Sequence, residues 1–213
     1  MFEGCPAFSP ASFFDFSLPV GYFSSLPFPK KMHKQLLLPD VSNLLSESSF
    51  AEVAMSWSED GLLFTITVNK KFEDCFYPNY LEGDAIELFI DTRDLKSGFM
   101  NRFCHHFLFL PKDVHGVQAQ EITRFRGEDE HPLCDPKDLA LEVQFEKNSY
   151  HALIKIPSDC LSGYDPLAWN KMAIAYRISR PQGGAQHFPV SSELYPIDQH
   201  PSLWCSSILE NER

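Results

Sequence analysis

The chain is 213 residues long, carries a formal net charge of -11 and has a hydrophobic content of 44%. These values suit a globular protein with a sizeable core. An acidic surface opposes non-specific contact with nucleic acid, because phosphate contacts need clusters of Lys and Arg. The basic run PKKMHK at residues 29–34 is too short to change this, so nucleic acid is excluded as a partner.

The N-terminal segment is rich in Phe, Pro and Ser and has no sustained period. It opens with MFEGCPAF, which has no basic residue, and Pro10, Asp15 and Pro19 interrupt the apolar stretch that follows. This pattern indicates neither a signal peptide nor a membrane contact, and it predicts a cytoplasmic protein. We expect residues 1–43 to form an irregular arm, with room for a short edge strand, that packs on a single domain of residues 44–213.

Six cysteines are spread along the chain without a C-x-x-C pair, namely Cys5, Cys75, Cys104, Cys134, Cys160 and Cys205. In a reducing compartment, cysteines with such spacing are expected to be free thiols, several of them buried as small hydrophobic residues.

Regular alternation of apolar and polar residues begins at Phe50. Two alternating stretches, FAEVAMSW at 50–57 and LLFTITVN at 62–69, flank SEDG at 58–61, which has the composition of a tight turn. Trp57 is in phase with the apolar face of the first stretch. This pattern predicts a β-hairpin with Trp57 in the core.

The next two predicted strands cover residues 85–91 and 103–110. In the first strand, Glu87 lies on the face opposite the apolar Ile and Leu residues, and the second is apolar on both faces, which is typical of a central strand. His105 and His106 are adjacent in the second strand, so they point to opposite faces and cannot chelate one metal ion together. Zinc would need further ligands from distant segments, and we assign no metal ligand here.

Further strands are predicted at LALEVQFE (139–146), YHALIKIP (150–157), KMAIAYRIS (171–179) and CSSIL (205–209), with a weaker one within 114–126. The acidic stretch GEDEHPLCDPKD is predicted to be a mobile loop. Seven to nine alternating strands with almost no amphipathic helix predict an all-β fold, an antiparallel β-sandwich with jelly-roll or immunoglobulin-like layers.

The order of the predicted strand motifs resembles that of a known family. The hairpin motif W-x-x-D-G-L-x-F-x-I-x-V is followed by G-D-A-I-E-L-F-I-D-T, then by Y-x-A-x-I-x-I-P and finally by P-S-L-W. This succession, over residues 50–209, resembles the family 9 carbohydrate-binding modules and the related DOMON-like sandwiches. The stretch IDTRDLKSGFMNRFCHHFLFLP is similar to a group of uncharacterised bacterial proteins with this sandwich. The D-x-I-E-L-F-I-D motif is more specific for the fold than for a function.

The resemblance implies a non-catalytic sandwich that holds a terminal sugar between two aromatic rings, often with structural calcium. Glu87 matches the glutamate of the strand motif. The resemblance offers Tyr80 or Tyr77 for the first ring and Trp204 or Tyr195 for the second. For Trp204, closing the core is the alternative role.

The basic group that the resemblance places on the next strand is replaced by Arg102, His105 or His106. Arg93, in the loop after the Glu87 strand, is a further candidate for ligand binding. Structural roles remain open for each: Glu87 with Arg102 could form a cross-strand ion pair, Arg93 could pair with a carboxylate, and one histidine could be buried and hydrogen-bonded.

The leading hypothesis is therefore a non-enzymatic, cytoplasmic sandwich that binds a small sugar or glycan near Glu87, Arg102 and His105, with calcium as an optional structural ion. A second hypothesis is a protein-interaction or structural module that has kept the fold without sugar binding. A third is a hydrolase or redox domain that uses His105 or His106. The sequence lacks G-x-S-x-G, a P-loop and H-E-x-x-H, which favours a protein that is not an enzyme.

Overall fold

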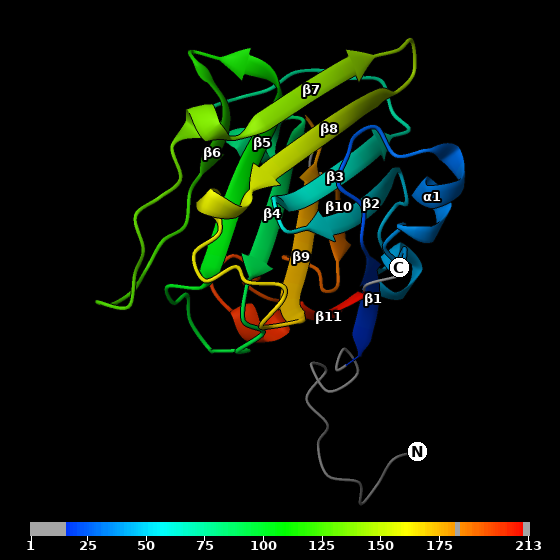
Figure 1. Ribbon diagram of the computed structural model, residues 1–213. Helices are drawn as coiled ribbons and strands as arrows, with labels where there is room; N and C mark the ends of the chain where they lie inside the picture. Colours follow the sequence, from blue (N-terminus) through cyan, green and yellow to red (C-terminus); the bar gives the residue numbers. More distant parts are fainter. Residues whose placement is uncertain (1–15, 182–183, 211–213) are drawn as a thin grey trace, which may run out of the picture.

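The structure, a computed structural model, describes residues 16–181 and 184–210. Two β-sheets pack face to face, and the strands of the smaller sheet cross those of the larger one (Figure 1). The prediction of a largely antiparallel β-sandwich is confirmed. Among the described residues, no helix has the length and apolar character needed to cross a membrane.

The larger sheet has seven strands in the order β1-β11-β9-β4-β5-β6, and β10 also pairs with β9. Its strands are β1 (Ser17–Gly21), β4 (Ala85–Asp91), β5 (Cys104–Val114), β6 (Val117–Glu121), β9 (Lys171–Ser179), β10 (Ala185–Phe188) and β11 (Cys205–Glu210). Every pair is antiparallel except β1 with β11. Strand β5 has a partner on each side, as its two apolar faces predict.

The smaller sheet has four antiparallel strands in the order β2-β3-β8-β7. They are β2 (Ala51–Ser58), β3 (Gly61–Val68), β7 (Ala140–Phe145) and β8 (Tyr150–Pro157). The predicted hairpin is β2 and β3, joined by a two-residue turn. Gly61 closes this turn with a φ of +129°, and a Cβ there would lie 2.1 Å from the carbonyl oxygen of Ile156. The turn therefore requires glycine at this position.

The core lies between the two sheets and follows from the alternation of the strands. Ile86, Leu88 and Ile90 of β4 are buried against the other layer, and Trp57 of β2 is buried as predicted. Each fully buried side chain of this size stabilises the fold by about 1.5–3 kcal/mol. Strand β7 lies at a sheet edge, so Phe145 is exposed even though its parity predicts burial.

The described part of the N-terminal segment is more regular than the sequence predicts. β1 adds an edge strand to the larger sheet, and two short helices follow, α1 (Lys30–Gln35) and α2 (Ser42–Leu45). Tyr22 packs edge-on against Trp57, with ring centroids 5.1 Å apart. The helices are too short to show a helical period in the sequence. Residues 1–15 of the predicted arm lie outside the described residues.

Two cysteines correct the prediction of free thiols. Cys134 and Cys160 form a disulfide, which ties the acidic loop to a short 3₁₀ helix at Ser158–Cys160. Their sequence separation of 26 residues gives no sign of this pairing, which depends on how β7 and β8 place the two segments. Cys75, Cys104 and Cys205 are buried free thiols, as predicted, and Cys5 lies outside the described residues.

Candidate functional site

Three polar side chains meet on the outer face of the larger sheet. Strand alternation directs Glu87 of β4 away from the core, and the register places Arg177 of β9 directly beside it. His106 of β5 is opposite Phe89, which is two positions along β4 on the same face. Thus three neighbouring strands contribute Glu87, His106 and Arg177 to one cluster, which we call the outer cluster.

The outer cluster is charged, buried and tightly hydrogen-bonded. Arg177 holds Glu87 in a bidentate pair, with Nε 2.5 Å from Oε2 and Nη2 2.7 Å from Oε1. His106 Nε2 lies 2.9 Å from the same Oε1. Burial raises the pKa of Glu87, but hydrogen bonds and charges from His106 and Arg177 outweigh it and leave this pKa below its usual value. Glu87 is therefore a carboxylate at neutral pH.

Aromatic packing fixes the position of this cluster. The His106 ring lies 4.3 Å from the ring of Phe89, centroid to centroid, and Trp204 packs on Phe89 at 5.8 Å. The backbone N–H of His106 donates to Thr123 Oγ1 at 2.8 Å. His106 is thus held from both its ring and its backbone, as a pre-organised binding group must be.

A cavity of about 280 Å³ lies over the outer cluster. It is lined by Tyr80, Met100, His106, Ile122, Arg124, Phe125, Arg126, Asp198 and Gln199. Its volume is close to the lower end of the range of small-molecule sites, about 300–1,000 Å³. Two aromatic rings and several charged or amide groups surround it. Rings can stack on the apolar faces of a sugar, while charged groups bond its hydroxyls.

Three residues that the sequence offered for ligand binding lie in this region: Tyr80 and His106 line the cavity, and Glu87 lies beneath it. Tyr80 begins a 3₁₀ helix, Tyr80–Glu82, just before β4. Burial, and then the charge of Glu87, raise the pKa of Tyr80 to about 12, so its hydroxyl stays protonated and can donate or accept. Tyr77, the other candidate for this ring, is 38% exposed and lies outside the cavity lining.

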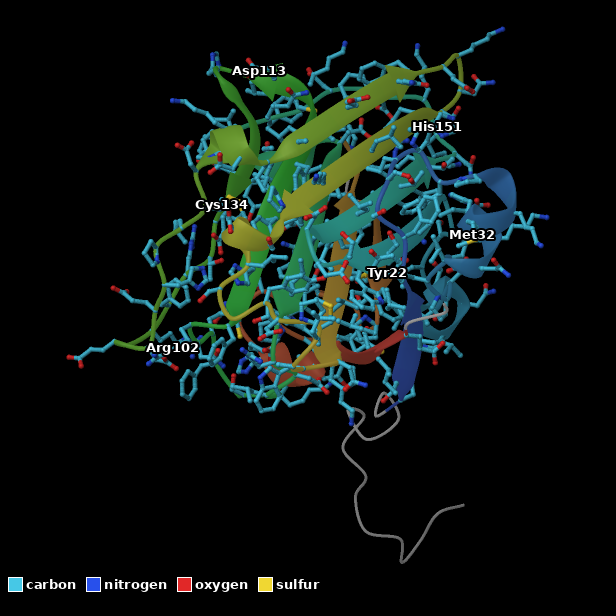
Figure 2. The ribbon with its side chains drawn as sticks, viewed as in Figure 1. Tyr22, Met32, Arg102, Asp113, Cys134 and His151 are labelled. Atoms are coloured by element: carbon cyan, nitrogen blue, oxygen red, sulfur yellow. A yellow bond between two sulfur atoms is a disulfide. The ribbon has the colours of Figure 1, made fainter. Side chains whose placement is uncertain are left out.

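Arg102 and Arg93, two further candidates for ligand binding, do not line this cavity. Arg102 precedes β5 instead of belonging to it, and its exposed side chain pairs with Asp129 at the edge of the molecule (Figure 2). The guanidinium of Arg93 lies over the ring of Trp169, 4.8 Å from its centroid. The expected pair between Glu87 and Arg102 is replaced by the pair with Arg177.

Trp204 and His105 also fall outside the cavity lining. Trp204 is fully buried and donates its Nε1–H to the carbonyl oxygen of Ile197 at 2.8 Å, so it offers no face to a ligand. It supports Phe89 from behind, which is the alternative role that the sequence left open. His105 points to the inner face of the sheet, opposite to His106 as alternation predicts, and is fully buried.

Sequence reasoning missed residues of both the outer cluster and the cavity. Arg177, in the outer cluster, had a usable signal, because it is a lone charge within the apolar part of a predicted strand. Arg124, Phe125 and Asp198 had none, since they belong to loops without a period and only the fold brings them together.

No protein-family model matches this sequence, and no curated protein matches it. Solved structures do match. A family 9 carbohydrate-binding module from Caldicellulosiruptor kristjanssonii, in complex with cellotriose, has a TM-score of 0.68 at 11% identity, over 93% of this chain and 95% of that chain. The chain has the fold of family 9 carbohydrate-binding modules.

Two further structures agree on this fold. A family 9 module from the same organism in complex with glucose has a TM-score of 0.64 at 12% identity, over 93% of this chain and 97% of that chain. A protein from Bacteroides uniformis that is proposed to bind carbohydrate has a TM-score of 0.58 at 10% identity, covering 92% and 99%. The recognition from the strand motifs is thereby confirmed for the family 9 fold. The DOMON-like relationship stays a prediction.

Proposed function

We propose that this protein is a non-catalytic module that binds a small sugar, or the end of a glycan, in the cavity over β4, β5 and β9. The observation that carries the proposal is a rigid, charge-balanced cluster beneath a small cavity with two aromatic rings. The fold supports it, since two of the similar structures hold glucose or cellotriose.

Each group of the cavity has a role in this proposal. Tyr80 and Phe125 present rings for the apolar face of a sugar, while Arg124, Asp198 and His106 bond its hydroxyls. Because the cavity measures about 280 Å³, it suits one or two sugar units and not a long chain along the sheet.

The arrangement argues against hydrolysis. Glycosidases need two carboxyl groups across the bond that is broken, one of them a proton donor with a raised pKa. Among the cavity-lining residues, Asp198 is the one carboxylate. Glu87 beneath them is held in its charged form by Arg177, so it has no proton to donate. Binding without catalysis is the chemistry that this site supports.

Calorimetric titration tests the site directly. We would titrate glucose, cellobiose, cellotriose and a uronic acid into the wild type, Tyr80→Ala and the matched control Tyr77→Ala, with calcium and with a chelator. We expect Tyr80→Ala to weaken binding about fivefold or more, since a stacking aromatic contributes on the order of 1 kcal/mol and each 1.4 kcal/mol is tenfold. Tyr77→Ala should bind as the wild type does. Equal loss in both variants, or no binding by the wild type, would contradict the proposal.

A role in protein interaction is the second candidate. The loops that follow β4 and the 3₁₀ helix at Ser158–Cys160 carry exposed apolar side chains, namely Leu95, Phe99, Leu167 and Trp169. Arg93 of the first loop lies on Trp169 of the second. Exposed apolar groups of this kind mark interaction surfaces when they form a patch. If no sugar binds, this surface becomes the next site to test.

A further inference from the structure

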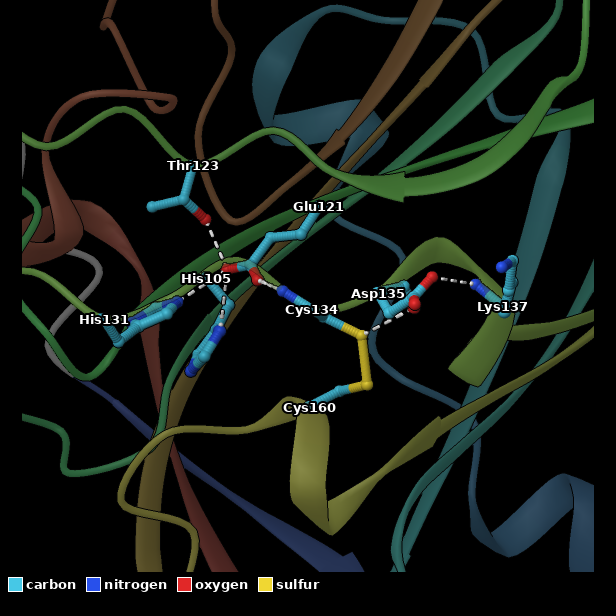
Figure 3. Close-up of a disulfide and its surroundings, with 8 residues drawn as sticks. All are labelled: His105, Glu121, Thr123, His131, Cys134, Asp135, Lys137 and Cys160. Atoms are coloured by element: carbon cyan, nitrogen blue, oxygen red, sulfur yellow. Dashed lines mark hydrogen bonds and ion pairs between the residues drawn. A yellow bond between two sulfur atoms is a disulfide. The ribbon is translucent and has the colours of Figure 1, made fainter.

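A second polar cluster lies on the inner face of the larger sheet, apart from the sugar cavity. His105 comes from β5, Glu121 ends β6, and His131 belongs to the acidic loop that follows (Figure 3). One ligand atom from each lies within 4.8 Å of the others. The distant partners that a zinc site at His105 needs are therefore present. We call these three residues the inner cluster.

The inner cluster converges on a single oxygen. His105 Nδ1 and His131 Nε2 each lie 2.9 Å from Oε1 of Glu121, and Thr123 Oγ1 lies 2.7 Å from the same atom. A carboxylate oxygen has two lone pairs, so three donors exceed its capacity. The other oxygen, Oε2, accepts only the backbone N–H of Cys134, at 2.8 Å, among the hydrogen bonds described for it. This crowding indicates that the two imidazoles and the carboxylate are arranged to bind a cation between them.

The outer partners of His131 agree with a metal ligand. Its Nδ1 lies 2.8 Å from the carbonyl oxygen of Arg102, which can only accept, so Nδ1 carries a proton. Nε2 faces Oε1 of Glu121 at 2.9 Å, where it donates a proton if the ring is charged and offers a lone pair to a cation if the ring is neutral. A ligating histidine typically donates its second ring nitrogen to a carbonyl or carboxylate in this way.

His105 is incompletely satisfied by the protein alone. It is fully buried, and its Nε2 has no hydrogen-bond partner within bonding distance, which is costly in the core. If Nδ1 donates its proton to Glu121, Nε2 is left as a bare lone pair. If Nδ1 instead binds a cation, Nε2 carries the proton.

We propose that His105, Glu121 and His131 form a binding site for zinc. Two imidazoles and one carboxylate are a donor set that zinc uses, with a fourth position left for another ligand. Calcium takes six to eight oxygen ligands and fits poorly here. In a tetrahedral zinc site, with bonds of about 2.0–2.1 Å, neighbouring ligand atoms are about 3.3 Å apart. The two separations between imidazole nitrogen and Glu121 oxygen, 2.9 Å each, need to widen slightly, and one ligand atom from each of the three residues lies within 4.8 Å of the others.

The surroundings supply both access and support. A surface cavity of about 340 Å³ is lined by His131, Cys134, Cys160 and neighbouring acidic residues, so the solvent side of the site reaches one of the three ligands. The disulfide fixes Cys134, whose N–H orients Glu121 (Figure 3). The ligand from the loop is thus tied to the two ligands on the sheet.

The test uses the full chain with its disulfide intact, stripped with a chelator and reloaded with zinc chloride. We expect one zinc ion per chain by elemental analysis, a rise in Tm with zinc, and visible absorption typical of a low-coordinate site when cobalt is used instead. His131→Gln should weaken zinc binding more than about 100-fold, because loss of even an outer partner costs about 10- to 100-fold.

The matched control is His151→Gln, which changes a partly exposed histidine on β8 that pairs with Thr67. It should bind zinc as the wild type does. His131 lies in a loop, so its variant should keep the fold, which circular dichroism checks. No stoichiometric zinc in the wild type, or the same affinity in His131→Gln and the wild type, would overturn the proposal.

Discussion

The outer and inner clusters each contain one of two adjacent histidines of β5, His106 and His105, but their carboxylates have different partners. On the outer face, Arg177 gives Glu87 a permanent positive partner in bidentate geometry. On the inner face, Glu121 faces two imidazoles, whose charge depends on what they bind. A carboxylate whose oxygens are both bonded to arginine is already neutralised, so it supports the floor of a pocket and does not bind a cation. A carboxylate paired with histidines remains open to a cation.

The comparison also shows what positions each cluster. The outer cluster draws on three adjacent strands, so the sheet register alone assembles it. The inner cluster needs a loop residue, His131, and a disulfide holds that loop near the sheet. We therefore expect the outer cluster to depend on the core and the inner one on the loop.

The largest effect is expected from breaking the outer pair. Arg177→Met leaves the fully buried carboxylate of Glu87 with only His106, and removing one partner of a buried pair costs about 3–5 kcal/mol. Urea denaturation measures the loss. The double variant Glu87→Met/Arg177→Met should recover most of it, because no unpaired charge remains. A double variant as unstable as the single one would show that the loss does not come from an unpaired charge.

A second effect concerns the pH dependence of stability. The folded pKa of Glu87 lies below its usual value, so its contribution to stability is present above about pH 4.5 and is lost as the pH falls through the folded pKa. The difference in free energy of unfolding between the wild type and Glu87→Gln should be constant from pH 7 to about pH 5 and shrink below. Denaturation across this range measures it. A difference that grows on acidification would contradict the charged state assigned to Glu87.

The smallest effect should come from Arg102→Ala. The side chain of Arg102 is 58% exposed and pairs with Asp129 at the surface, where such pairs contribute about 0–1 kcal/mol. We expect stability within that range and unchanged sugar affinity, measured by denaturation and titration. A loss of sugar binding would show that Arg102 contributes to the sugar site, against its assignment to the surface.

The sequence predicts much of the fold because alternation is a local signal. The β2–β3 hairpin, the apolar face of β4 and the opposite orientations of His105 and His106 all follow from a period of two. The helices α1 and α2 did not, because they are too short to show a period. The sequence left both a stacking role and a core role open for Trp204, because residue type alone does not tell a buried ring from an exposed one, and it did not show that Arg102 precedes β5.

The candidate sites were harder to predict, since each depends on register and loop path. Glu87 could be found from its motif, but its partner Arg177 is 90 residues away. His131 lies in a stretch that composition marks as mobile, and the structure instead anchors it through Glu121 and the disulfide at Cys134. Long-range convergence of this kind leaves no trace in a local pattern.

The parallel pairing of β1 with β11 bears on the order in which the chain folds during synthesis. Ser17 pairs with Ser206, far along the chain, so β1 lacks its partner strand in the larger sheet until β11 has left the ribosome. Val20 of β1 likewise becomes buried only when this pairing forms. A contact of such high sequence separation forms late, because the chain between must first be ordered. The sandwich can therefore close this edge only after β11 has been synthesised.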